Sequence, residues 1–181
     1  MKSDTRINIH LGASSNIIPG WINYDIDSSG GAIKADLING IPLVDNTVNK
    51  IFSEHVIEHF TKESGYMLIK ECYRVLKPGG TMRIGWPGLN RLVSSYLTHS
   101  RKHKKHILPH LNLRYGHWDE ILADRLFSWE HRYAYTPRHM KDILKEIGFV
   151  EPRQCKYMNS RYGYCWDTHN DPVTIYIEVK K

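Results

Sequence analysis

Apolar positions along the chain form short runs that are separated by turn-forming residues. Within these runs β-branched and aromatic side chains predominate, which is typical of β-strands. The run near the end of the chain alternates strictly, with an apolar residue at every second position from Val173 to Val179. We therefore expect strands over residues 7–11, 21–26, 32–37, 48–53, 81–86, 149–157 and 173–179.

Helical spacing of apolar residues predicts three helices between these strands. Thr61 can cap the first, which a Lys-Pro-Gly-Gly segment at 77–80 ends. The second is expected over residues 89–106, before Pro109. The third spans residues 136–148, where a threonine and a proline begin the helix and a glycine ends it.

This order of elements indicates the fold class and the domain organisation. Strands that alternate with helices favour an open, mostly parallel α/β sheet with helices on its faces. The length of 181 residues suits a single domain over residues 1–181. Residues 89–135 interrupt the alternation, and we interpret them as a helical and loop insertion that covers a binding site at the edge of the sheet.

Composition narrows the location and class of the protein. No apolar run approaches the roughly 20 residues that cross a bilayer, and the first residues lack the apolar core of a signal peptide. We therefore expect a cytoplasmic protein without a membrane partner, and the sequence leaves its oligomeric state open. The cysteines Cys72, Cys155 and Cys165 match no zinc spacing and fit a reduced compartment.

The net charge of +6 is concentrated in part in the Arg-Lys-His-Lys-Lys run at 101–105. Such a run can be a solvated helix face, or it can meet an acidic acceptor or the phosphates of a nucleic acid. The histidines of this region would share one stripe of a helix, which is a spacing that can bind Zn²⁺ or Ni²⁺. A proline interrupts the helix and no carboxylate or cysteine joins the pattern, so we expect no metal site among His99, His103, His106 and His110.

Polar residues follow the ends of the first three expected strands, where open sheets bind their ligands. Gly12 follows the first strand and lets the backbone approach a ligand, although an ordinary turn glycine is the alternative. Asp25 ends the second strand, where a carboxylate can accept hydrogen bonds from both ribose hydroxyls. Asp36 and Leu37 follow the third and can contact an adenine ring. Each residue alone also fits a surface turn, but three in order favour a nucleoside-bearing cofactor.

At these positions the sequence resembles the class I S-adenosylmethionine-dependent methyltransferases, in particular the branch with a Leu-Gly-Cys-Gly first motif. The most specific parts are Val-Leu-Lys-Pro-Gly-Gly before a strand and a Glu-His pair after the fourth strand. The resemblance implies a Rossmann-like sheet that is mostly parallel with a final antiparallel strand and helices on both faces. It also implies S-adenosyl-L-methionine as the cofactor. It runs through residues 9–12, 19–25, 35–37, 45–60, 73–80 and 148–149.

The resemblance further implies which residues hold the cofactor. Gly12 and its neighbours would face the methionine part, Asp25 the ribose, and Asp36 with Leu37 the adenine. The chain has Gly-Ala-Ser where the family usually has Gly-Cys-Gly, which predicts a reshaped methionine pocket. The complete implied set is His10, Gly12, Ala13, Ser14, Asp25, Ile26, Asp36, Leu37, Ser53, Glu54 and His55.

Methyl transfer from a sulfonium needs alignment above all, with a base only where the acceptor must lose a proton. His55 and His59 are the candidate bases, because they would share a face if this stretch were helical, and Glu58 can orient or charge one of them. Alternatively, Glu58 and His59 brace the loop. The residues expected to contact the acceptor are Trp86, His131, Tyr133 and Tyr135, and for the last three an aromatic packing cluster is the alternative.

We therefore expect an S-adenosylmethionine-dependent methyltransferase that acts on a small-molecule or sugar-like acceptor. One alternative is a catalytically impaired S-adenosylmethionine-binding module or partner subunit. Another is a nucleic-acid methyltransferase that uses the basic run at 101–106 as a phosphate-facing patch. No Asn/Asp-Pro-Pro-Tyr-like motif follows the fourth strand, which disfavours methylation of base amino groups.

Overall fold

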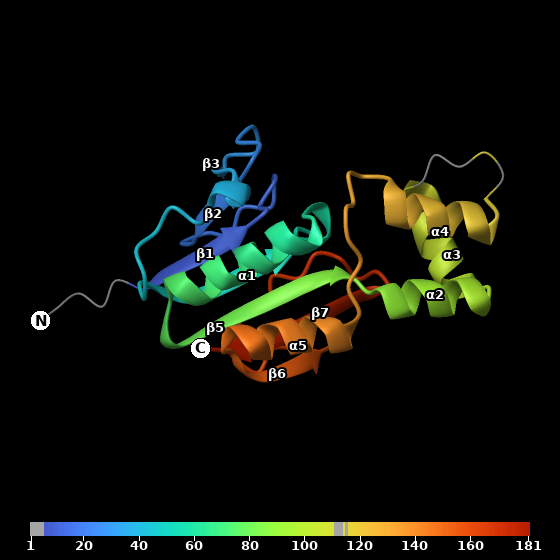
Figure 1. Cartoon of the computed structure of the whole chain (residues 1–181). Helices are drawn as coiled ribbons and strands as arrows, with labels where there is room; N and C mark the ends of the chain where they lie inside the picture. Colours follow the sequence, from blue (N-terminus) through green and yellow to red (C-terminus); the bar gives the residue numbers. More distant parts are fainter. Residues whose placement is uncertain (1–5, 111–113, 115) are drawn as a thin grey trace, which may run out of the picture.

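The computed structural model describes residues 6–110, 114 and 116–181. Their strands form one seven-stranded sheet in the order β3-β2-β1-β4-β5-β7-β6 (Figure 1). All neighbouring strands are parallel except β7, which runs antiparallel to β5 and β6. This confirms the expected fold class. The strands are β1 Ile7–Leu11, β2 Ile22–Asp25, β3 Ile33–Lys34, β4 Val48–Glu54, β5 Leu76–Pro87, β6 Val150–Cys155 and β7 Thr174–Lys180.

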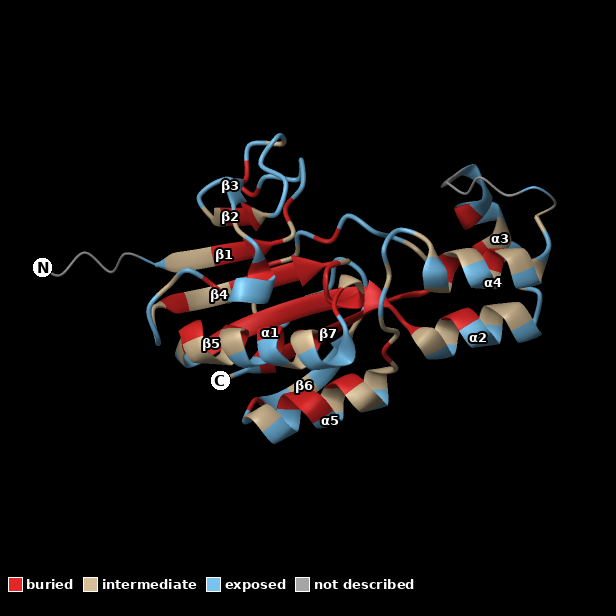
Figure 2. Cartoon of the chain, turned by 45° about the horizontal axis from the view of Figure 1, so that its top comes forward, coloured by how far each residue is buried: buried red, intermediate tan, exposed pale blue. Residues whose placement is uncertain are grey.

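One face of the sheet is covered by helices α1 (Lys62–Val75) and α5 (Pro137–Ile147), which contact each other (Figure 1). Thr61 caps α1 and its hydroxyl accepts a hydrogen bond from the Ser64 amide. Thr136 caps α5 in the same way, and Gly148 ends it in the left-handed conformation with φ 116°. Both helices therefore form where the capping residues predict. Figure 2 shows that the central strands of the sheet are mostly buried, whereas the helices and loops around them carry more exposed residues.

The opposite face of the sheet is covered by the connection between β6 and β7, residues 156–173, which we call the β6–β7 cover. Tyr164 packs against Phe52 and Ile18, and its hydroxyl donates to the Ile51 carbonyl at 3.1 Å. The resemblance implies helices on both faces, but here this irregular segment lies where helices are expected on the second face. The short and turn-rich β1–β2 connection forms no helix to take that place.

The β6–β7 cover is attached by charges buried on the second face. Arg83 is fully buried, and its guanidinium contacts Asp167 and Glu178. It also donates to the carbonyls of Lys156 and Asn159. Arg83 and Glu178 are register partners on β5 and β7, so the sheet itself brings the opposite charges together. Burying this arginine is tolerated because all of these acceptors surround it.

The insertion after β5 contains helices α2 (Leu89–Leu97), α3 (Arg101–Ile107) and α4 (Trp118–Phe127), with a 3₁₀ turn η3 (Leu108–His110). It lies beyond the carboxyl end of β5 (Figure 1). Arg125 of α4 pairs with Asp171 of the β6–β7 cover at 2.9 Å, which ties the insertion to the sheet.

The single helix expected over residues 89–106 is wrong. The chain breaks between α2 and α3, where His99 adopts φ 45° and Ser100 caps the second helix. The continuous histidine stripe therefore does not form, because His99 is exposed whereas His103 is buried. The side chain of His110 lies outside the described residues.

Two element boundaries also differ from the expected ones. The third strand is only two residues long, and Asp36 instead caps a 3₁₀ turn η1 (Leu37–Asn39) by accepting from the Ile38 amide. The segment at 77–80 belongs to β5 rather than to a helix terminus, since α1 ends at Val75 and the strand follows at once.

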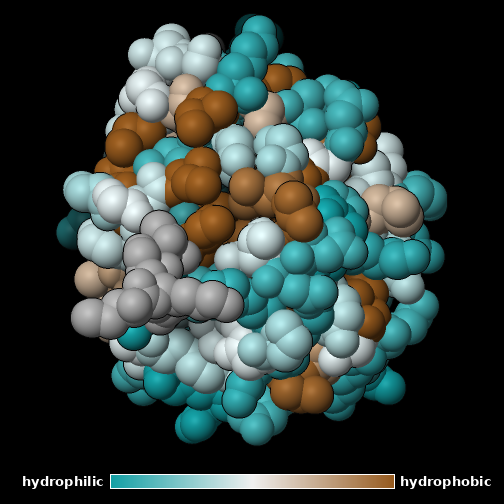
Figure 3. Space-filling view, turned by 90° about the vertical axis from the view of Figure 1, so that its left-hand side faces the viewer, coloured by the Kyte–Doolittle hydropathy of each residue, from teal (hydrophilic) through white to brown (hydrophobic). Residues whose placement is uncertain are grey.

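The edge at the amino ends of the strands carries small groups of hydrophobic side chains between hydrophilic ones (Figure 3). Within the described residues, no helix is both long enough and apolar enough to cross a membrane.

We predict that the buried charges hold the β6–β7 cover in place. Asp167→Ala removes a partner of the buried Arg83 guanidinium and should lower the free energy of unfolding by about 3–5 kcal/mol. The matched control is Glu151→Gln in the exposed pair with Arg161, where the loss should stay under about 1 kcal/mol. Urea unfolding measures both, and equal small losses would contradict a structural role for the buried cluster.

Candidate functional site

The order of the strands reverses between β1 and β4, which is where open α/β sheets bind ligands. The carboxyl ends of β3, β2, β1 and β4 follow one another along this edge. The residues expected to bind a cofactor follow these four ends, so the topology places them in one row.

The loop after β1 is held in a conformation that requires glycine. Gly12 has φ 72°, and a Cβ at this position would lie 2.0 Å from Cγ2 of Val56. The Asp25 carboxylate closes the loop, because it accepts from the Ser14 amide at 2.8 Å and from the Asp27 amide at 2.9 Å. Asp25 therefore shapes the loop, a role that its position at a strand end does not reveal.

A first cavity of about 440 Å³ opens beside this loop. It falls within the roughly 300–1,000 Å³ typical of ligand sites. Five of the expected cofactor residues line it: His10, Gly12, Ser14, Glu54 and His55. The remaining lining residues are Asn16, Ile17, Ile18, Phe52, Trp166, Thr168 and His169.

The other expected cofactor residues lie outside this first cavity. Ala13 and Ser53 are buried, and Leu37 packs in the core. Ile26 and Asp36 are exposed, and both Asp36 oxygens accept hydrogen bonds within η1.

His10 is a buried wall of the first cavity. Its Nδ1 lies 3.3 Å from Oδ1 of Asn23, and its ring packs against Phe52. Burial lowers the pKa of His10, although the Asn23 contact opposes the shift. The amide oxygen of Asn23 can only accept from the ring, and a hydrogen bond with the Asn16 backbone also opposes the lowering of the pKa.

Glu54 at the end of β4 links the sheet to the β6–β7 cover. Its carboxylate accepts from the Thr168 amide and hydroxyl, from the His169 amide and from the Tyr176 hydroxyl. Burial alone would raise the pKa of this carboxyl, but hydrogen bonds from His169, Thr168 and Tyr176 outweigh it and lower the pKa to about 2. In return the carboxylate raises the pKa of His169.

His55 follows Glu54 with φ 53°, so it does not share a helical face with His59 as expected. Its Nδ1 lies 3.1 Å from Oε1 of Glu58, and its Nε2 lies 3.0 Å from the Thr174 hydroxyl. Burial alone would raise the pKa of Glu58, but the contact with His55 outweighs it and lowers the pKa. His55 and Glu58 thus form a histidine–carboxylate pair, while His59 packs against His131 in the 3₁₀ turn η2 (Ile57–His59).

A second cavity, also of about 440 Å³, lies between η2 and the insertion. His55 and His169 line both cavities, so the two cavities meet at these rings, whose centroids are 4.1 Å apart. The rest of its lining comes from η2, the insertion and the segments that follow it: His59, His106, Ile107, Arg125, Trp129, His131 and Asp171.

Among the residues expected to contact the acceptor, His131 lines the second cavity, whereas Tyr133 is half-buried outside its lining. The expectation for Trp86 and Tyr135 needs correction. Both are buried in the core, and the Trp86 indole N–H donates to the Tyr135 carbonyl at 3.0 Å. Both belong to the hydrophobic core, which agrees for Tyr135 with the alternative of an aromatic packing cluster.

Sequence reasoning missed the contribution of the β6–β7 cover, whose residues Trp166, Thr168 and His169 line the first cavity. The available signal was polar rather than a motif. Residues 174, 176 and 178 of the last strand are polar or amphipathic and lie on the face opposite its apolar residues. This pattern indicates that another segment of the chain packs against that face as well.

Comparison with known proteins identifies the family that this arrangement resembles. Residues 23–84 match the model of the methyltransferase domain family. A comparison with curated proteins finds no match. Solved structures of S-adenosylmethionine-dependent methyltransferases share the fold across nearly the whole chain.

Three of these structures illustrate the likeness. A methyltransferase of Archaeoglobus fulgidus is 17% identical, with 97% of this chain and 86% of that chain covered and a TM-score of 0.61. One of Thermotoga maritima is 15% identical, with coverage of 97% and 82% and a TM-score of 0.60. One of Mesorhizobium loti is 12% identical, with coverage of 98% and 91% and a TM-score of 0.60.

We predict that Glu54 stabilises the fold in a pH-dependent manner. A carboxyl whose pKa falls from 4.5 to about 2 contributes stability that is present above pH 4.5 and is lost as the pH falls toward 2. Glu54→Gln should therefore lower the free energy of unfolding at pH 7 by an amount on the order of 3 kcal/mol. The difference from the wild type should narrow between pH 7 and pH 3 in urea unfolding, and a difference independent of pH would contradict this role.

Proposed function

We propose that this class I S-adenosylmethionine-dependent methyltransferase transfers the methyl group from a cofactor in the first cavity to a small-molecule or sugar-like acceptor in the second. The observation that carries the proposal is that His55 and His169 line both cavities. A reaction between two bound molecules requires such a meeting point, because the donor, the methyl group and the acceptor atom must lie in line. The family match and the shared fold support the donor half of the proposal.

The order of the strands supports one orientation of the bound cofactor along the edge of the sheet. The methionine arm would lie over β1 and β4 in the first cavity, the ribose at Asp25 after β2, and the adenine beside Asp36 and Leu37 after β3. Three strand spacings cover about 14 Å, which an extended nucleoside with an amino-acid arm can follow. Asp25 already accepts two backbone hydrogen bonds, but a carboxylate offers about four acceptor positions and can also bind ribose hydroxyls.

The methionine arm would meet a pocket built differently from the usual Gly-Cys-Gly loop. His10 lines the first cavity, where its ring would lie beside the amino-acid end of the arm. Ser14 lines the first cavity, while Ala13 turns into the core and leaves the cavity open. The Gly-Ala-Ser sequence is therefore compatible with a bound cofactor.

His55 is the residue best placed to accept a proton from the acceptor. Nδ1 carries its proton toward Glu58, so Nε2 is the basic atom of the ring. The Thr174 hydroxyl lies within hydrogen-bonding distance of Nε2, which shows that a hydroxyl group can reach this atom. For a hydroxyl acceptor, the oxygen loses its proton to Nε2 and forms a bond to the methyl carbon. S-adenosylmethionine would supply the methyl group, and its sulfur would keep the electron pair of the broken carbon–sulfur bond.

The insertion at 89–135 would cover the second cavity, where the acceptor is proposed to bind. It contributes Ile107 and Arg125 to the second cavity, and the Arg125–Asp171 pair holds it against the β6–β7 cover. Connecting segments of this kind select substrates while the sheet provides the common chemistry. The acceptor class would therefore be determined by the insertion.

We predict that Asp25 is required for cofactor binding. Asp25→Ala removes the proposed ribose acceptor and the support of the Ser14 amide, so the affinity for S-adenosylmethionine should fall by roughly tenfold or more. Calorimetry with S-adenosylmethionine and S-adenosylhomocysteine measures this. Asp27→Ala is the matched control, because its carboxylate is exposed and accepts hydrogen bonds from Ser29 within its own turn. Absence of binding to the wild-type chain at millimolar cofactor would refute the donor half of the proposal.

We further predict that His55 matters for turnover more than for cofactor binding. With a panel of hydroxylated small molecules and sugars, His55→Gln should lower kcat by roughly 100-fold or more, as loss of a general base does. Cofactor affinity should change much less. Formation of S-adenosylhomocysteine measures the reaction. Cofactor binding without turnover on any acceptor would instead favour the binding module, and transfer to RNA or DNA that weakens steeply with salt would favour the nucleic-acid alternative.

A further inference from the structure

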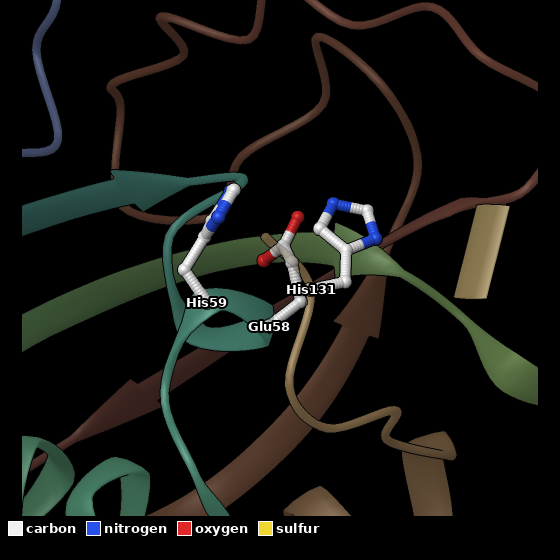
Figure 4. Close-up of side chains that lie close together, drawn as sticks. All are labelled: Glu58, His59 and His131. Carbon is white, nitrogen blue, oxygen red and sulfur yellow. The ribbon is translucent and has the colours of Figure 1, made fainter. Parts of the chain in front are cut away.

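We propose that Glu58, His59 and His131 bind a divalent transition-metal ion beside the second cavity. Each residue offers one ligand atom, and these atoms all lie within 4.8 Å of one another. Figure 4 shows the Glu58 carboxylate between the two imidazole rings. Two histidines and one carboxylate are a donor set that binds first-row metal ions and leaves other coordination positions open.

The Glu58 carboxylate supplies an independent reason to expect a ligand. Its side chain is 2% exposed, and within the described part of the chain only Oε1 has a side-chain partner, the His55 ring. His55 lies 3.1 Å from Oε1, which leaves Oε2 facing the histidine pair without a partner. A carboxylate buried in this way is costly unless a cation or a donor reaches it.

His131 is oriented as a metal-binding histidine. Its Nδ1 lies 3.0 Å from the Arg125 carbonyl and can donate to it, which leaves the other ring nitrogen with a lone pair. In Figure 4 that other nitrogen faces Glu58. Metal-binding histidines commonly donate their second nitrogen to a backbone carbonyl, because this fixes the tautomer and the direction of the ring.

The backbone holds the three residues together independently of their side chains. The Glu58 carbonyl accepts from the amides of Arg132 at 2.8 Å and Tyr133 at 3.2 Å. These bonds bring the segment after the insertion against η2, so that the rings of His59 and His131 are 5.0 Å apart and nearly perpendicular. Small changes in side-chain rotamers would then bring all three ligand atoms to one ion.

This site differs from the one that the sequence analysis considered and rejected. The histidines at 99, 103, 106 and 110 were expected to share a helix and to lack a carboxylate. The proposed ligands instead come from two segments more than seventy residues apart, which only the fold brings together. The expectation of no metal was argued only for those four histidines and did not consider Glu58, His59 and His131 together.

A cation at this site would determine which groups of the proposed acceptor bind there and how they react. Its open positions would face the cavity lined by His59 and His131, where oxygen atoms of the acceptor could bind. A bound divalent ion lowers the pKa of a coordinated hydroxyl, which would assist its loss of a proton near His55. This role rests on the proposed function, whereas the binding of the ion does not and is measured without cofactor or acceptor.

The test uses Mn²⁺ with the full chain after removal of metals by a chelator. Calorimetry, together with loss of the free Mn²⁺ signal in electron paramagnetic resonance, should show one site per chain that binds Mn²⁺ roughly tenfold or more tightly than Mg²⁺, since Mg²⁺ prefers oxygen ligands alone. His59→Gln, His131→Gln and Glu58→Gln should each weaken Mn²⁺ binding by roughly tenfold or more. Circular dichroism establishes that each variant is folded, and the two histidine variants suffice if Glu58→Gln is not.

Two matched controls separate this site from binding by surface groups. His99→Gln removes an exposed histidine of the insertion, and Glu63→Gln removes an exposed carboxylate at the start of α1. Both should leave Mn²⁺ affinity unchanged. Absence of Mn²⁺ binding at millimolar concentration would overturn the proposal, as would binding that the ligand variants retain. Neither result would bear on S-adenosylmethionine binding, which the Asp25 variants test separately.

Discussion

The structure depends on charges buried on the second face of the sheet. Arg83 in the middle of β5 and Glu54 at the end of β4 would each be costly to bury alone. Their partners come largely from the β6–β7 cover, in which Asp167 contacts Arg83, and Thr168 and His169 donate to Glu54. These ion pairs and hydrogen bonds hold in place an irregular segment where helices are expected.

The same attachment forms the functional site. Because Glu54 is held by the β6–β7 cover, His169 stacks beside His55, and these two rings separate the first cavity from the second. The Arg125–Asp171 pair then fixes the insertion against the same segment. One connection thus covers the sheet, lines the first cavity and anchors the insertion beside the second, so the cover links stability to the proposed chemistry.

Much of the fold and part of the site followed from the sequence. The capped helices at Thr61 and Thr136 and the order of polar residues after the strands were local signals, and five expected cofactor residues meet at one cavity. What could not be predicted depends on contacts between distant segments. The helix breaks at His99, which adopts a positive φ although it is not a typical turn residue. Glu58 lies beside His131 because the Glu58 carbonyl accepts backbone hydrogen bonds from residues 132 and 133. Burial of Trp86 likewise depends on packing against the segment that carries Tyr135.

In the proposed reaction a methyl group passes between the two cavities at His55 and His169. A crystal structure with S-adenosylhomocysteine tests it most directly, because the position of the sulfur locates the end of the reaction path. We predict that the amino-acid arm lies in the first cavity and that the sulfur is directed past His55 toward the second. A cofactor bound elsewhere on the sheet, or one whose sulfur points away from the second cavity, would contradict it.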